Sequence, residues 1–286
     1  MDAATRRGGG SVSGRGRRYP RKALVGALVA LFALAGTAGA VRLRGGDILI
    51  IGDGGFTPKA LPRTHDAPID IHLHGRIETV SGVLPPALKE IMFEFDRHGH
   101  LDSTGLAVCS IARLEATTVP KARKLCPGAI VGTGFGRAIV KFPEQAAIPV
   151  SSPITIFNGP KKDGDFTVLA HGYTTIPVPT TIVVPIVIEK VNHGVYGYRT
   201  VGRIPELAGG YGIPISASLT VGREWIHNGD RHSYLNARCE TGRLQARGEF
   251  IFRDGTLIKG TFLKPCKVRP ESRGIGPRPR HPSRGL

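Results

Sequence analysis

The feature that most constrains the fold is a succession of short runs in which apolar or β-branched residues alternate with polar ones. Gly, Pro and Asn separate these runs, and the 286 residues include 39 Gly and 22 Pro. Alternation with a period of two is typical of strands that bury one face, whereas the 3.6-residue period of amphipathic helices is scarce here. The sequence therefore predicts an all-β protein, built as antiparallel β-sandwiches or as an irregular barrel of about twelve strands.

The expected elements are short. Strand candidates cover residues 47–51, 69–79, 90–96, 129–141, 154–157, 165–170, 180–190, 195–201, 213–221, 233–238, 245–252 and 256–263. Two brief helices are expected at 86–90 and 119–125, because Pro120 suits a first helical turn. The dipeptide Asp254-Gly255 predicts a tight hairpin between the last two strands.

The first 40 residues are organised like an export signal. Seven Arg and Lys precede residue 23, an uncharged run occupies 23–40, and this run ends in Ala38-Gly39-Ala40. That order predicts a signal peptide cleaved after Ala40. A retained N-terminal membrane anchor is the alternative, because 18 apolar residues can just span a bilayer. No other run approaches this length, which excludes a multi-span helical membrane protein.

The remaining chain divides by composition into three parts. Residues 41–67 are expected to be a linker with a first strand, and 68–266 a β-rich domain of one or two lobes. Residues 267–286 are expected to be a basic, disordered tail, with six Arg and Lys against one Glu.

The positive charge is concentrated outside the expected domain. Of the formal net charge of +17, the first 40 residues carry +6 and the tail +5, which leaves +6 on residues 41–266. Nucleic-acid binding is therefore not expected, because it requires a basic face on the folded part. The tail suits contact with an anionic envelope polymer or lipid, and the alternative is a solvated extension without a partner.

The four cysteines all follow the cleavage site. An even number of cysteines in an exported chain predicts disulfides. Three connectivities are possible, and pairing of sequence neighbours, Cys109 with Cys126 and Cys239 with Cys266, is expected. A zinc site built on them is not expected, because the chain contains no C-x-x-C pair.

Four segments carry a resemblance to a known group of proteins. They are PPALKEIMFEFDRHGHLDSTGLAVC (85–109), ARKLCPGAIVGTG (122–134), FNGP (157–160) and HSYLNARC (232–239). Together they resemble uncharacterised secreted bacterial β-rich proteins, over most of 68–267. The resemblance implies an exported, disulfide-containing protein and supplies no catalytic residue.

Motifs for covalent or phosphate chemistry are missing from the sequence. It contains no G-x-S-x-G elbow and no S-x-x-K motif. The glycine-rich run at 132–136 is not followed by a third glycine, because Arg137 stands in that place, and a strand follows where a phosphate loop requires a helix. The acidic residues between Glu78 and Asp102 are expected to be solvated strand and turn residues rather than a glycosidase pair.

Two H-x-H elements form the candidate metal site. Strands 69–79 and 90–96 each place apolar residues at odd positions, so a hairpin between them would set His72 opposite His98 and Arg76 opposite Glu94. His72, His74, His98 and His100 would then share one outer face, where imidazoles and nearby carboxylates suit zinc or copper. A solvent-facing strand is normally polar without any ligand, and on this ground we expect no bound metal and no cofactor.

The aromatic residues leave two interpretations open. Trp225 lies beside a predicted turn, and loop aromatics next to Arg and Asn suit a glycan or peptide surface. Core packing is the expectation we prefer, because large aromatics are mostly buried. We therefore predict a binding or structural role at the cell envelope or outside the cell, and a secreted hydrolase or metal-dependent enzyme using a His/Asp cluster is the alternative.

Overall fold

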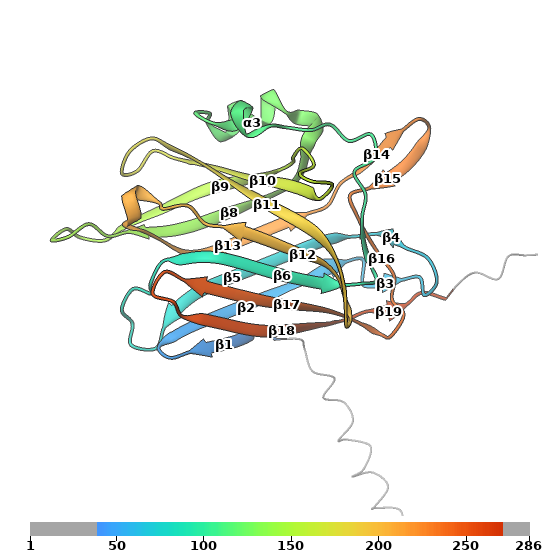
Figure 1. Ribbon diagram of the computed structural model, residues 1–286, viewed down its shortest axis with the longest axis horizontal. Coiled ribbons are helices and arrows are strands. Elements are labelled where there is room, and N and C mark those ends of the chain that lie inside the picture. The colour runs from blue at the N-terminus through green and yellow to red at the C-terminus, as the bar shows by residue number, and fades with distance from the viewer. Residues whose placement is uncertain (1–38, 271–286) are drawn as a thin grey trace, which may run out of the picture. The chain divides into compact units, whose positions relative to one another are not determined.

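The computed structural model describes residues 39–270 (Figure 1). Its antiparallel strands form one large sheet that curls until the edge strands β1 and β18 face each other. In spatial order the strands are β1 (Val41–Gly45), β2 (Ile48–Thr57), β5 (Asp70–Thr79), β13 (Gly212–Val221), β8 (Ile130–Val140), β9 (Ile148–Asn158), β10 (Phe166–Thr174), β11 (Thr180–His193), β12 (Tyr196–Arg203), β6 (Leu88–Asp96), β17 (Arg243–Phe252) and β18 (Leu257–Pro265). The 12-stranded sheet is a nearly closed barrel, which confirms the all-β prediction.

Smaller elements lie around this barrel. Two sets of short strands pair near one end. Strand β3 (Ala60–Leu61) pairs with β19 (Lys267–Val268), and β16 (Leu235–Ala237) pairs with β4 (Ala67–Pro68) and β7 (Gly99–Leu101). A separate hairpin joins β14 (Glu224–His227) to β15 (Asp230–Ser233). The helical elements are α2 (Ile111–Leu114), α3 (Val119–Leu125) and the 3-10 turns η1 (Pro127–Ala129) and η2 (Ala208–Gly210).

Side chains rather than a backbone ladder close the barrel. We call the junction between β1 and β18 the seam. Leu43 of β1 lies over Gly260 of β18, and Ile258 of β18 lies over Gly45 of β1. A Cβ atom at Gly260 would be 2.3 Å from a methyl carbon of Leu43, so glycine is required for this close approach.

The barrel interior is filled unevenly. One half is packed by a cluster that includes Val131, Ile156 and Tyr234, and this cluster reaches from β7 across β8 to β11. The other half is packed at one end by Ile50, Phe252 and their neighbours. Alternation explains both clusters, because every second residue of each strand faces inward.

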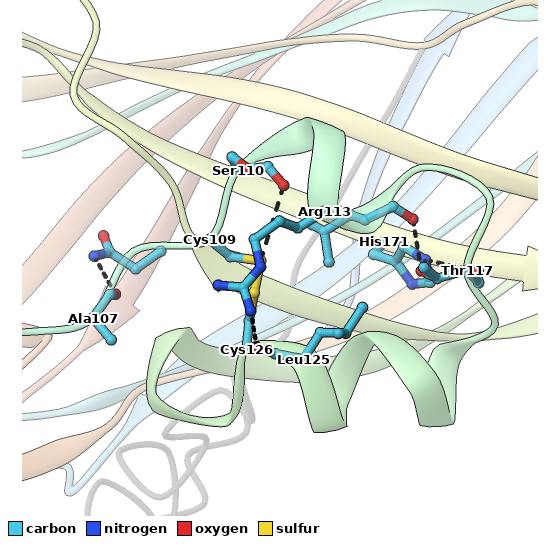
Figure 2. Close-up of a disulfide and its surroundings, with 10 residues drawn as sticks. Ala107, Cys109, Ser110, Arg113, Thr117, Leu125, Cys126 and His171 are labelled. Atoms are coloured by element: carbon cyan, nitrogen blue, oxygen red, sulfur yellow. Dashed lines mark hydrogen bonds between the residues drawn. A yellow bond between two sulfur atoms is a disulfide. The ribbon is translucent and has the colours of Figure 1, made fainter.

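Helices α2 and α3 cover the outer faces of β9 and β10 (Figure 1). The disulfide Cys109–Cys126 ties the two helical segments together, with Cα atoms 5.8 Å apart. Figure 2 shows Arg113 donating to the Leu125 carbonyl oxygen at 2.8 Å across this disulfide. Below the helices His171 is fully buried beside Thr117, and burial lowers the pKa of its imidazole.

A further apolar cluster closes the end of the barrel where the short strands pair. It contains Phe56, Leu61, Ile69 and the disulfide Cys239–Cys266. Both disulfides therefore join the sequence neighbours, as predicted.

The sequence-based element boundaries hold in most places. Helix α3 has the predicted bounds, and Asp254-Gly255 forms the turn between β17 and β18, where Gly255 has a φ of 88°. The helix expected at 86–90 is wrong, because Leu88 begins β6 with its side chain buried in the interior. The tail expected from Lys267 begins as strand β19, which pairs in parallel with β3.

The predicted hairpin between β5 and β6 is wrong. Strand β5 pairs with β2 and β13, whereas β6 pairs with β12 and β17. The apolar residues at odd positions correctly predicted which face of each strand points inward. They do not identify the pairing partner, because any two strands of a barrel have their apolar faces on the same side. The register that would set His72 opposite His98 and Arg76 opposite Glu94 does not occur.

Two predictions concern residues outside the described range. Almost all of the predicted signal segment lies in residues 1–38, and most of the basic tail lies in 271–286. The helices within 39–270 are too short or too polar to cross a membrane.

Candidate ligand-binding cavity

A cavity of about 350 Å³ occupies the half of the barrel interior that side chains leave unfilled. It lies between the end cluster around Phe56 and the cluster around Phe252, on the inner faces of β2, β5, β6, β13, β17 and β18. Its apolar lining consists mainly of Ile50, Phe56, Ile69, Ile71, Leu73, Ile77, Leu88, Ile91, Phe93, Phe95, Leu219, Leu244, Phe250 and Phe262.

The alternation of the strands builds this lining. On β5 the odd residues Ile71, Leu73 and Ile77 face the cavity, and the even residues between them are exposed. On β17 the inward positions Leu244, Ala246 and Gly248 precede the larger Phe250 and Phe252, and Ala246 leaves space where a larger side chain would fill the interior. The inward faces predicted for 69–79 and 90–96 are thus correct, although their pairing is not.

Arg76 on β5 and Asp96 on β6 are charged residues of the lining, and a further group of charges lies at a place that we call the port. It comprises Asp53, Lys59 and Lys264 beside the seam. Lys264 shares the inward face of β18 with Phe262, and its side chain is only 13% exposed. Its Nζ lies 2.8 Å from Oδ1 of Asp53, whose side chain is 52% exposed.

The pKa values at the port reflect two cations around one carboxylate. The hydrogen bond from Lys264 lowers the pKa of Asp53, aided by the backbone N–H of Gly54. Burial lowers the pKa of Lys59, and the nearby charge of Lys264 lowers it further. The Lys59 ammonium lies 4.5 Å from the centre of the ring of Phe56, which is a residue of the cavity lining.

The four candidate histidines do not come together. His72 and His74 lie exposed on the outer face of β5, where Nδ1 of His72 is 3.1 Å from Oγ1 of Thr220. His98 is held between two carboxylates, with Nδ1 2.7 Å from Asp96 and Nε2 2.7 Å from Glu240. His100 lies on β7, opposite Asn236.

Neither histidine pair forms a metal site here. Both ring nitrogens of His98 are within 2.7 Å of carboxylates, and His98 lies in the turn between β6 and β7, whereas His72 lies on β5, which does not pair with either strand. Within the described range, no group of three or more His, Cys, Asp or Glu side chains is placed to hold a metal ion.

Comparison of the chain with family models, with curated proteins and with solved structures finds no match. The function must therefore be argued from the site alone.

A second group of polar residues surrounds the only tryptophan. His232 Nδ1 lies 2.8 Å from Asp102, and the indole of Trp225 stacks on the His232 ring with centres 5.6 Å apart. Trp225 also donates from Nε1 to the Thr104 carbonyl oxygen and packs against the interior cluster. An Asp–His pair of this kind can orient a general base, but in residues 39–270 no serine or cysteine side chain is hydrogen-bonded to His232.

The most buried acid of the described chain lies on the outer face of β6. Glu94 is fully buried beneath Arg199, Arg247 and His193, with side-chain distances of 2.9, 2.5 and 2.8 Å. Burial alone would raise its pKa, but the hydrogen bonds from Arg199 and His193 and the charge of Arg247 more than offset this and hold the pKa of Glu94 below its usual value. The cluster ties β6 to β11, β12 and β17 on the surface opposite the cavity.

Sequence reasoning missed the cavity and the port. The inward residues were expected to fill a core, and side-chain volumes cannot be summed without the strand order. One signal was present in strand 257–265. Its inward face carries Ile258, Gly260, Phe262 and Lys264, so a lysine occupies a position where the alternation predicts a core residue.

Proposed function

We propose that this protein is exported to the cell envelope or beyond and binds a small apolar molecule inside its barrel. The observation that carries the proposal is the apolar cavity of about 350 Å³ between two packed clusters. Ligand sites in proteins have volumes of roughly 300–1,000 Å³ and are mostly apolar with a few placed polar groups. The cavity and its port have both properties.

The size of the cavity argues for an occupant. Unfilled apolar volume destabilises proteins, because the lining residues lack packing partners on one side. Filling by a ligand relieves this cost, and an apolar ligand does so best because water gains few hydrogen bonds there.

The chemistry of the lining favours binding over catalysis. The charged residues beside the cavity are engaged with one another, as Lys264 is with Asp53. The titratable groups of the lining, such as Asp53 and Lys264, lie at its border, and the rest of the lining is mainly apolar. The hydrolase alternative has the Asp102–His232 pair as its best support, but that pair lies outside the residues that line the cavity.

Two observations support export. The two disulfides indicate an oxidising compartment, since such bonds are rare in the cytosol. The order of charge and hydropathy in residues 1–40 is that of a signal peptide.

Titration with the neutral fluorophore N-phenyl-1-naphthylamine tests the proposed binding. This probe fluoresces strongly only in apolar surroundings, so the full chain should bind it with a stoichiometry near one and enhance its emission. The variant Ala246→Phe places an aromatic ring in the cavity and should weaken binding at least about tenfold, because the ring occupies the probe's volume.

The matched control is Thr261→Phe on the neighbouring strand. Thr261 faces outward and is exposed, so the same ring there should leave the affinity within about twofold. Equal probe affinity in wild type and Ala246→Phe would place the probe elsewhere and reject the cavity as the site.

A further inference from the structure

Resting on the proposed function, we propose that the ligand is a single-chain amphiphile with a carboxylate head group, and that Lys264 and Lys59 bind this head group at the port. The apolar chain of the ligand would then lie along the inner faces of β6, β17 and β18. The proposal depends on the position of the port, its charge and the volume of the cavity.

The port lies where the seam loses one strand. Strand β1 pairs with β2 only as far as the Val41 and Gly52 partners, and β2 continues to Thr57. Along most of the seam, β1 stands between β2 and β18. Beyond Gly52 β1 has ended, and the ion pair of Lys264 with Asp53 bridges β18 and β2 directly. This single ion pair, in which the Asp53 side chain is 52% exposed, is a weak closure, so we expect the barrel wall to open here.

The charge at the port is unbalanced toward the positive. Lys59 and Lys264 face one carboxylate, Asp53, and His74 on the neighbouring strand also acts on that carboxylate. Burial and the charge of Lys264 both lower the pKa of Lys59, and since two ammonium groups share one carboxylate, a second anion would stabilise this pair. A carboxylate bound here accepts charge-assisted hydrogen bonds, the strongest class available to a lysine.

The two lysines also stand in the right place relative to the apolar lining. Lys264 shares the inward face of its strand with Phe262, and the Lys59 ammonium lies against Phe56. Both aromatic residues line the cavity. A head group held by these lysines therefore has the apolar space directly behind it.

The volume limits the ligand to one chain. A space of about 350 Å³ holds about a dozen groups the size of a water molecule. This suits a saturated chain of about ten to twelve carbons and is too small for the two chains of a phospholipid.

Isothermal titration of the full chain with dodecanoate and with 1-dodecanol tests the head-group assignment, because the two ligands share a chain and differ in charge. We expect dodecanoate to bind at least about tenfold more tightly than dodecanol. The double variant Lys59→Gln/Lys264→Gln should remove this preference and leave the dodecanol affinity within about twofold. Lys259→Gln on the outer face of β18 is the matched control and should change neither affinity.

Asp53→Asn keeps the proposal testable if the double variant does not fold. This variant removes the carboxylate that competes for Lys264, so it should tighten dodecanoate several-fold and leave dodecanol unchanged. Weaker dodecanoate binding in Asp53→Asn would overturn the assignment.

The remaining outcomes are also decisive. If dodecanol and N-phenyl-1-naphthylamine bind but dodecanoate has no advantage, the head-group assignment fails and the proposed function stands. If dodecyl phosphate binds tightly and dodecanoate does not, the carboxylate is the wrong head group. If no apolar probe binds at all, the proposed function itself fails.

Discussion

At the scale of the residue, the burial of the Glu94 carboxylate is the feature with the largest desolvation cost. A buried carboxylate is stable only when it is paired and hydrogen-bonded, and two arginines and a histidine supply this at Glu94. The three cationic side chains remain between 34% and 44% exposed, so water shares the solvation of the cluster.

Replacing Glu94 by Gln should lower the free energy of unfolding by about 2 kcal/mol at neutral pH, because the guanidinium groups lose their buried counter-charge. Urea unfolding followed by circular dichroism measures this change. Glu90→Gln is the control: its partner Arg203 is almost fully exposed, and its loss should cost less than about 0.5 kcal/mol. Equal losses in the two variants would show that the cluster adds no more than a surface ion pair.

The same carboxyl predicts a pH dependence. The folded-state pKa of Glu94 lies below its ordinary value of 4.5, so its contribution to stability is complete above that pH and is lost as the pH falls through the folded-state pKa. The difference in unfolding free energy between wild type and Glu94→Gln should therefore shrink as the pH falls below about 4.5. A difference that grows toward low pH would contradict this sign.

At the scale of the element, the seam depends on glycine. Gly260→Val should lower the free energy of unfolding by about 1–3 kcal/mol, because the new side chain occupies the position of Leu43. Thermal unfolding of Gly260→Val and of Gly75→Val compares the two sites. A Cβ at Gly75 meets no atom within 4 Å, so valine there should be tolerated, and equal destabilisation would mean that the seam is not closed by this contact.

The helical cover should depend on its disulfide. Removing the bond by replacing Cys109 and Cys126 with Ala should cost about 3 kcal/mol, since a loop of 17 residues is no longer closed in the unfolded chain. Chemical denaturation under oxidising conditions gives the value. Because the helices lie on the outer face, opposite the cavity, this variant should retain probe binding, and its loss would show that the cover also shapes the cavity.

Much of each element could be predicted from the sequence, and little of their arrangement. Alternation correctly assigned the inward faces of β5 and β6, and Pro120 correctly indicated the first turn of α3. The pairing of β5 with β2 and β13 could not be predicted, because parity is satisfied by many strand orders and long-range closure decides among them.

At the scale of the whole molecule, the proposed ligand binding depends on a barrel that is packed in one half and hollow in the other. The hollow half could not be predicted, because Phe93, Leu219 and Phe262 look like ordinary core residues along the chain. Lys264 resembles a surface lysine along the chain, and its inward position is recognised only when it is compared with Phe262 and Ile258 on the same face of the strand.

A crystal structure with 12-bromododecanoate tests whether the ligand chain lies inside the barrel, because the anomalous signal of bromine locates the end of the chain. The proposed binding mode predicts a carboxylate density near Lys264 and one bromine site within the barrel, toward the cluster around Phe252 at the far end of the cavity. A bromine site on the outer surface, with the interior free of ligand density, would contradict it.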